Sequence, residues 1–183
     1  WEAAFLAPAL RGGVMPDHTG YCEVKYMTSD GAAVRSLGGM RVTPDQAAGP
    51  LPETCAGVVL AGGTSWQTPG AERIVPVVEE ALRRGLPVGA ICNAASFLAA
   101  HGFLNEVRHT GNTAEMLQEW GGERYTGAAR FEERQAVRDG NIVTANGSGF
   151  LEFTREYLLA LGADTPEAIG AWYEFHKQGF YRA

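Results

Sequence analysis

Cys92 is the residue whose position in this sequence best supports chemistry. It follows a short apolar run at residues 87–91, Pro-Val-Gly-Ala-Ile, and precedes residues 93–100, whose composition is typical of a helix. A residue between a strand and a helix lies in a tight turn with its side chain projecting. The helix N-terminus favours an anion there and lowers the pKa of a cysteine thiol. The pattern therefore predicts a nucleophilic thiolate at Cys92.

A glycine loop, Ala61-Gly62-Gly63, ends the preceding apolar run at residues 55–60. Ligands of a doubly wound sheet bind outside the carboxyl ends of its strands, where both this loop and Cys92 are expected. Glycine also allows close approach of the backbone to a ligand. The N–H groups of Gly63 and Asn93 are therefore candidates for an oxyanion hole.

The positions of the other cysteines and of the histidines give less support for a catalytic or metal-binding role. Cys22 and Cys55 fall inside strand-like runs and are interpreted as small buried residues. The cysteine spacing fits neither a metal site nor an even set of disulfides, so we expect reduced thiols. The histidines show no ligand spacing with cysteine or carboxylate; they are His18, His101, His109 and His176. We expect no metal and no cofactor.

Periodicity indicates the elements that position Cys92. Strands are expected at residues 21–27, 34–37, 54–60 and 87–91, a hairpin at 135–137 and 142–145, and helices at 2–10, 74–82, 92–100, 113–120, 150–161 and 169–176. Strands that alternate with helices predict an α/β fold with a mostly parallel sheet covered on both faces. No repeat or linker divides the chain, so residues 1–183 are interpreted as a single domain.

Composition excludes several classes of protein. With 183 residues and 45% hydrophobic content, the chain can build one sizeable core. Its net charge of −6 argues against nucleic acid as a partner, because phosphate binders normally carry a basic face. No apolar run reaches the roughly 18 residues of a membrane span, and the first ten residues have no basic leader. We therefore expect a cytoplasmic protein.

Four motifs, in this order, resemble those of the ThiJ/PfpI family, also called the DJ-one family, in the class I glutamine-amidotransferase-like superfamily. They are Ala-Gly-Gly at 61–63, Gly-Ala-Ile-Cys-Asn-Ala-Ala at 89–95, Gly-Phe-Leu-Asn at 102–105, and Thr-Ala-Asn-Gly-Ser-Gly-Phe-Leu-Glu-Phe at 144–153. The resemblance covers nearly the whole chain. It implies a flavodoxin-like three-layer sandwich with a nucleophile elbow, and a homodimer.

The resemblance also assigns roles to residues. Cys92 corresponds to the reactive cysteine and Glu2 to the carboxylic acid beside it, which can donate to a thiolate if burial raises its pKa. On its own, Glu2 reads equally well as a solvated residue at a helix start. Peptidases and amidases of the family carry a histidine where this chain has Asn112. His109 lies three residues earlier and is interpreted as a structural strand residue, with reach to Cys92 as the alternative.

Two further expectations concern the ends of the chain. Family members open with a central strand, whereas this sequence begins at Trp1-Glu2, so we expect a strand and turn of about 10–18 residues to precede it. Near the other end, aromatic side chains either serve a dimer interface or pack on the sheet; they are Trp172, Tyr173, Phe175, Phe180 and Tyr181.

Three functions are consistent with these residues. The leading one is a cysteine-dependent hydrolase or lyase without the usual histidine, acting on a small electrophile; amidase, glyoxalase-like and isonitrile-hydratase-like activities are the candidates. The second is a stress-response protein that senses oxidants through oxidation of Cys92. The third is a non-catalytic binding module with a pocket beside Trp66, although Trp66 reads equally well as ordinary loop packing. The sequence does not identify the substrate.

Overall fold

A four-stranded sheet forms the centre of the protein. The computed structural model describes residues 1–179, and its main sheet has the order β5 (Val58–Leu60), β6 (Val88–Ile91), β8 (Ile142–Ala145) and β7 (Ala136–Asp139). The first three strands are parallel, and β7 returns antiparallel to β8 through the expected hairpin. Ile91 pairs with Ala145, so β6 and β8 end together.

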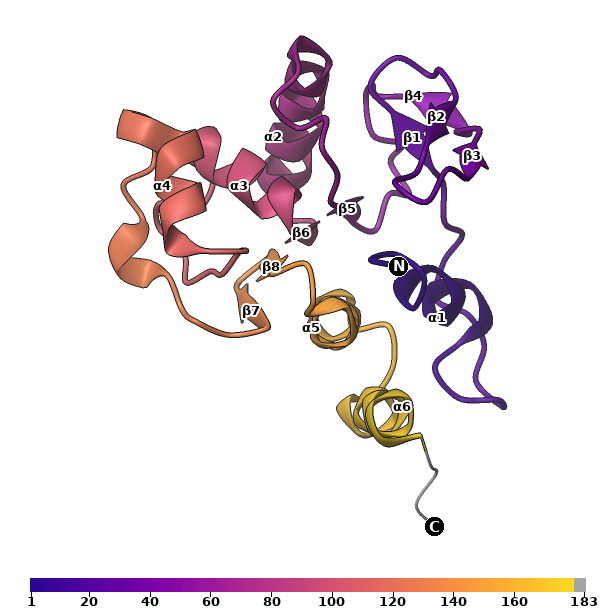
Figure 1. Cartoon of the computed structure of the whole chain (residues 1–183). Coiled ribbons are helices and arrows are strands. Elements are labelled where there is room, and N and C mark those ends of the chain that lie inside the picture. Colours follow the sequence, from indigo (N-terminus) through magenta and orange to yellow (C-terminus); the bar gives the residue numbers. More distant parts are fainter. Residues whose placement is uncertain (180–183) are drawn as a thin grey trace.

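Helices cover both faces of this sheet (Figure 1). On one side of the sheet, α2 (Val75–Arg83), α3 (Asn93–Ala100) and α4 (Ala114–Gly121) share a core with it, and α4 lies against α3. On the other side, α1 (Leu6–Gly12), α5 (Phe150–Leu161) and α6 (Pro166–Gln178) share the second core, and α6 lies against α5. Ala90 belongs to the first core and Ile91 to the second, because successive strand residues point to opposite faces. The predicted α/β sandwich is confirmed.

Short elements complete the chain. Two small sheets pair β1 (Met27–Thr28) with β4 (Gln46–Ala47) and β2 (Val34–Arg35) with β3 (Arg41–Val42). The 3₁₀ segments are η1 (Pro69–Ile74), η2 (Gly122–Arg124) and η3 (Ala128–Arg130). In the described part of the chain, no helix is both long and apolar enough to cross a membrane.

Two predicted elements need correction. The strand expected at residues 21–27 is wrong except at Met27. Burial alternates as predicted through residue 25, but residues 21–26 pair with no other strand in the described chain. Their backbone bonds go instead to the end of α1, at Leu10, and to Asp45. The helix expected from Glu2 begins only at Leu6, because residues 2–5 form turns that direct the Glu2 side chain toward Gly62.

The expectations about buried side chains have mixed outcomes. Cys22 and Cys55 are half-buried rather than fully enclosed, and both are free thiols. Trp172 is buried and packs in the core beside α5 and α1. Phe180 and Tyr181 lie outside the described residues.

A glycine in β6 sets how closely α5 packs on the sheet. A Cβ on Gly89 would lie 2.7 Å from Tyr157 Cδ2 and 2.8 Å from Phe153 Cζ, so only glycine leaves room for these rings. The Tyr157 hydroxyl in turn lies 3.0 Å from the carbonyl oxygen of Val58 and 3.2 Å from that of Pro87, as a donor to these groups. This packing fixes α5 beneath the two strands that lead to the glycine loop and to Cys92.

Replacing Gly89 with alanine should lower the free energy of unfolding by about 1–3 kcal/mol, the usual cost of overpacking a core. Chemical denaturation measures the change. Gly170→Ala is the matched control: Gly170 lies within α6 with no heavy atom within 4 Å of an added Cβ, and alanine there should stabilise the helix by up to about 1 kcal/mol. Equal effects of the two substitutions would contradict the packing argument.

Candidate active site

Cys92 occupies a strained turn between β6 and α3. Its backbone has φ 61° and ψ −130°, and it is the one non-glycine residue with positive φ among residues 1–179. Such a conformation costs about 1–3 kcal/mol and persists only where the surroundings enforce it. Here the N–H of Cys92 donates to the carbonyl of Ala145 at 2.9 Å, and its carbonyl accepts from Ala95 at 3.0 Å. The half-buried sulfur therefore projects from the end of the sheet at the expected elbow.

Two asparagine side chains lie beside the sulfur. Asn112 Nδ2 is 3.3 Å from Cys92 Sγ and 3.2 Å from Asn93 Oδ1. Asn112 Oδ1 accepts from the N–H of Gly147 at 3.0 Å, while Asn93 Nδ2 donates to the carbonyl of Gly63 at 2.9 Å. A backbone N–H only donates and a backbone carbonyl only accepts. The Gly147 N–H therefore fixes which way the Asn112 amide faces, and the Gly63 carbonyl does the same for the Asn93 amide. Asn112 must present its donor to the sulfur.

Glu2 lies on the glycine-loop side of the sulfur. Its carboxylate accepts the N–H of Gly62 and shares a hydrogen bond with the Cys92 side chain. Burial raises the pKa of Glu2 above the ordinary glutamate value and outweighs these two hydrogen bonds, which lower it. The protonated acid is therefore retained at higher pH than in an exposed glutamate.

Gly62 leaves the space that Glu2 and Cys92 occupy. A Cβ at this position would lie 2.7 Å from Cys92 Cβ and would collide with both carboxylate oxygens of Glu2. Sequence reasoning selected the N–H of Gly63 in this loop; the structure adds the N–H and the missing side chain of Gly62. Among the described residues, no protein acceptor binds the N–H of Gly63 or of Asn93, which leaves both available as donors.

His109 is a structural residue. Its Nε2 lies 2.6 Å from the hydroxyl of Tyr125 and its Nδ1 lies 2.7 Å from the carbonyl of Val107. The side chain is buried, and this burial lowers its pKa. Both ring nitrogens are engaged away from Cys92, so the alternative in which His109 serves the thiol is wrong. The position facing the sulfur from this segment belongs to Asn112.

Gly147 is a site residue that sequence reasoning missed. Besides orienting Asn112, it lies so near the thiol that an added Cβ would be 3.1 Å from Cys92 Sγ. Trp1 Nε1 donates to its carbonyl at 3.3 Å. The signal was present, because Gly147 stands in the family-like run at residues 144–153.

An open cavity of about 430 Å³ adjoins Asn112 and is lined largely by polar side chains, including Arg134, Gln135 and Asn146.

The fold and this site together define a class of protein: a flavodoxin-like α/β domain with a cysteine at a nucleophile elbow and a carboxylic acid beside it. Within residues 1–179, no group of three or more histidine, cysteine or acidic side chains could hold a metal ion.

Comparison with known proteins agrees with that class. The chain belongs to the DJ-1/PfpI family, whose sequence pattern matches residues 1–160. It is 35% identical to a Bacillus subtilis protein named uncharacterized protease YdeA, over 99% of this chain and 87% of that protein.

Solved structures show the same fold. A thiJ/pfpI family protein from Bacillus anthracis superposes with a TM-score of 0.89 at 30% identity, covering 98% of this chain and 85% of that one. The DJ-1 superfamily protein Atu0886 from Agrobacterium tumefaciens gives 0.82 at 35% identity, covering 98% and 93%.

Replacing His109 with glutamine should leave the rate of Cys92 alkylation by iodoacetamide within a few-fold, whereas removal of a working base costs 10²–10⁴-fold in catalysis. The rate should show one principal titration, without a histidine-like step near pH 6.5. Mass spectrometry of the Cys92 peptide measures the rate, with circular dichroism as a check of folding. A loss of the larger size in turnover with the fold intact would restore a cysteine–histidine mechanism.

The same variant tests the pH dependence of stability. Because His109 has a lowered pKa in the folded state, protonation favours the unfolded chain, and its stabilising contribution is lost as pH falls below about 6.5. His18 has a raised pKa and acts with the opposite sign, but it is common to both proteins. Denaturation at pH 7.5 and 5.5 should therefore show a smaller acid-induced loss for His109→Gln than for the unmodified protein.

Proposed function

We propose that this protein is a cysteine-dependent enzyme that adds the Cys92 thiolate to an electrophilic carbon of a small molecule. The observation that carries the proposal is the nature of the groups around the sulfur. Asn112 Nδ2 donates from 3.3 Å, and the shared hydrogen bond with Glu2 involves an acid whose pKa is raised by burial. A neutral thiol has two acceptors here: the ionised carboxylate of Glu2, whose pKa this hydrogen bond lowers, and Asn93 Oδ1 at 3.9 Å. When Glu2 holds the proton, the same contact supplies a donor to the sulfur. Donors directed at sulfur favour its anionic form.

Addition to a carbonyl illustrates the chemistry. The thiolate forms a bond to the carbonyl carbon, and the electron pair of the C=O bond moves to oxygen. The free N–H groups of Gly63 and Asn93 are the proposed donors to this oxyanion. Glu2 then transfers its proton to the oxygen, which leaves a neutral thiohemiacetal and a Glu2 carboxylate. That carboxylate can next accept a proton from the adduct or from water.

The lack of a second acid–base group narrows the substrate class. Cleavage of an amide requires protonation of the departing amine and deprotonation of water, and Asn112 does neither at neutral pH. Glu2 alone must carry every proton. This favours addition to aldehydes, ketones or isonitriles over peptide hydrolysis, even though the Bacillus subtilis relatives are named uncharacterized proteases.

Oxidant sensing is the second candidate, and the same contacts favour it. A peroxide oxidises the thiolate to a sulfenate with release of water, and a second equivalent gives a sulfinate. The added oxygens would accept from Asn112 Nδ2 and from protonated Glu2. This function requires no turnover of an organic substrate, so the assay below separates the two candidates.

A panel of methylglyoxal, simple amides and an isonitrile should identify at least one substrate that is turned over, and Cys92→Ser should abolish that turnover. Cys55→Ser is the matched control, because Cys55 is also a half-buried free thiol but its Sγ contacts the carbonyl of Gly57. Product formation is followed by chromatography. Absence of turnover on the whole panel, together with oxidation of Cys92 by stoichiometric peroxide, would favour the sensor.

Glu2→Gln should separate proton transfer from stabilisation of the thiolate. Glutamine can accept from Gly62 and donate to sulfur, as the protonated acid does, but it carries no transferable proton. Alkylation of Cys92 should stay within a few-fold, while turnover should fall by about 10²–10⁴-fold. Glu2→Ala, which leaves the N–H of Gly62 unpaired, should impair both. Full turnover by the glutamine variant would exclude Glu2 as the proton carrier.

A further inference from the structure

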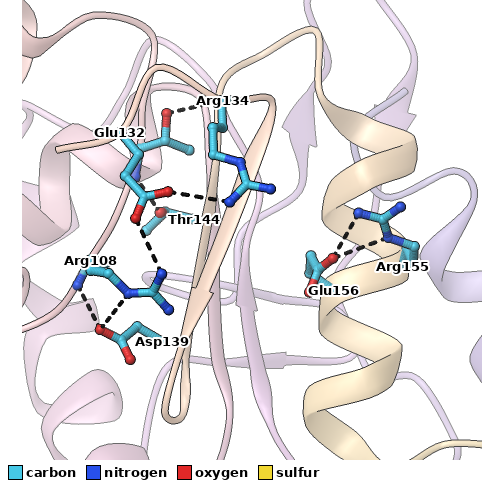
Figure 2. A network of polar contacts seen from close by, with 8 residues as sticks. Arg108, Glu132, Arg134, Asp139, Thr144, Arg155 and Glu156 are labelled. Atoms are coloured by element: carbon cyan, nitrogen blue, oxygen red, sulfur yellow. Dashed lines mark hydrogen bonds and ion pairs between the residues drawn. The ribbon is translucent and has the colours of Figure 1, made fainter. Parts of the chain in front are cut away.

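Thr144 in β8 uses its side chain to hold a neighbouring loop. Its Oγ1 accepts from the backbone N–H of Thr110 at 2.8 Å, and both residues are buried. The hydroxyl of Thr110 donates in turn to the carbonyl of Arg134 at 2.9 Å. Figure 2 shows Thr144 and Arg134 in this polar network, together with the Arg108–Glu132 ion pair. The segment that leads to Asn112 is thus fixed to β8.

The strand does not itself require this hydroxyl. Backbone groups pair Thr144 with Ala90 on β6 and with Val137 on β7. Valine has the same shape and an equally high preference for strands. A buried hydroxyl in place of a methyl group must therefore find polar partners, and the N–H of Thr110 is the partner observed here.

Residues at and just after the end of β8 hold Cys92 and the Asn112 amide. The carbonyl of Ala145 binds the N–H of Cys92, and the N–H of Gly147 binds Asn112 Oδ1. Thr144 adds the third contact, through Thr110. Among the described residues, the backbone N–H groups of Gly111 and Asn112 have no protein acceptor. The N–H of Thr110 is therefore the nearest backbone donor before Asn112 that is held by a protein group.

We propose that Thr144 is a positioning residue, which sets the distance between the Asn112 amide and the Cys92 sulfur through Thr110. The inference rests on the proposed function, because it assumes that the amide stabilises the thiolate. The Asn112–sulfur contact is 3.3 Å, and hydrogen bonds weaken steeply as geometry departs from the optimum. Loss of the Thr144 hydroxyl leaves the segment free to shift, and the donor then reaches the sulfur less well.

The test measures Cys92 alkylation by iodoacetamide against pH, with mass spectrometry of the Cys92 peptide. Thr144→Val should lower the rate at pH 7 by about fivefold, the factor that corresponds to one ordinary hydrogen bond, and should move the midpoint of the curve to higher pH. Thr144→Ser retains the hydroxyl and should restore both values. Thr154→Val is the matched control: Thr154 is equally buried, but its hydroxyl bonds the carbonyl of Phe150 within α5.

A double variant distinguishes positioning from general destabilisation. If Thr144 acts through Asn112, Thr144→Val should have no further effect in an Asn112→Ala background, whereas independent effects would add. Additive effects, or a Thr144→Val curve equal to that of Thr154→Val, would overturn the inference while the turnover results for Cys92→Ser still support the proposed function. An unchanged curve for Asn112→Ala alone would refute both this inference and the role of the amide. Thr144→Ala replaces the valine variant if valine does not fold.

Discussion

The positive φ of Cys92 is the constraint on which the rest of the site depends. At 61° this backbone is unfavourable for a residue with a side chain, yet it is the conformation that turns the chain from β6 into α3 and points the sulfur outward. The parallel pairing of β6 with β8 enforces it, because the register places the carbonyl of Ala145 against the N–H of Cys92. Packing that stabilises the sheet therefore also maintains the strain at the nucleophile.

The electrostatics of the site follow from which side chains reach the sulfur. The amide of Asn112, whose oxygen accepts from Gly147, presents a donor to the sulfur and cannot accept a proton. Burial raises the pKa of Glu2, the proposed proton carrier. A histidine at position 112 would supply a second acid–base group. In the mechanism that we propose, hydrogen bonds stabilise the thiolate and a single carboxylic acid moves protons.

The sequence predicted most of the fold because hydrophobic periodicity is a local signal. The strands after residue 57 and the helices from α2 to α6 lie where their patterns place them, and so does the elbow. The prediction was wrong at residues 21–26, where alternating burial occurs without a strand partner. Periodicity reports which face of a segment is apolar, whereas strand formation also depends on another segment being aligned beside it.

The sequence by itself determined the elbow cysteine and the glycine loop, because each is a residue type at a fixed spacing along the chain. Its resemblance to the family indicated in addition that Asn112 stands where other members carry a histidine. Only the tertiary structure decided that Asn112 faces the sulfur while His109 bonds Tyr125, that Gly62 makes room for Glu2, and that Gly147 orients the amide. Those contacts join loops that are far apart in sequence, and their distances depend on how the strands and helices pack.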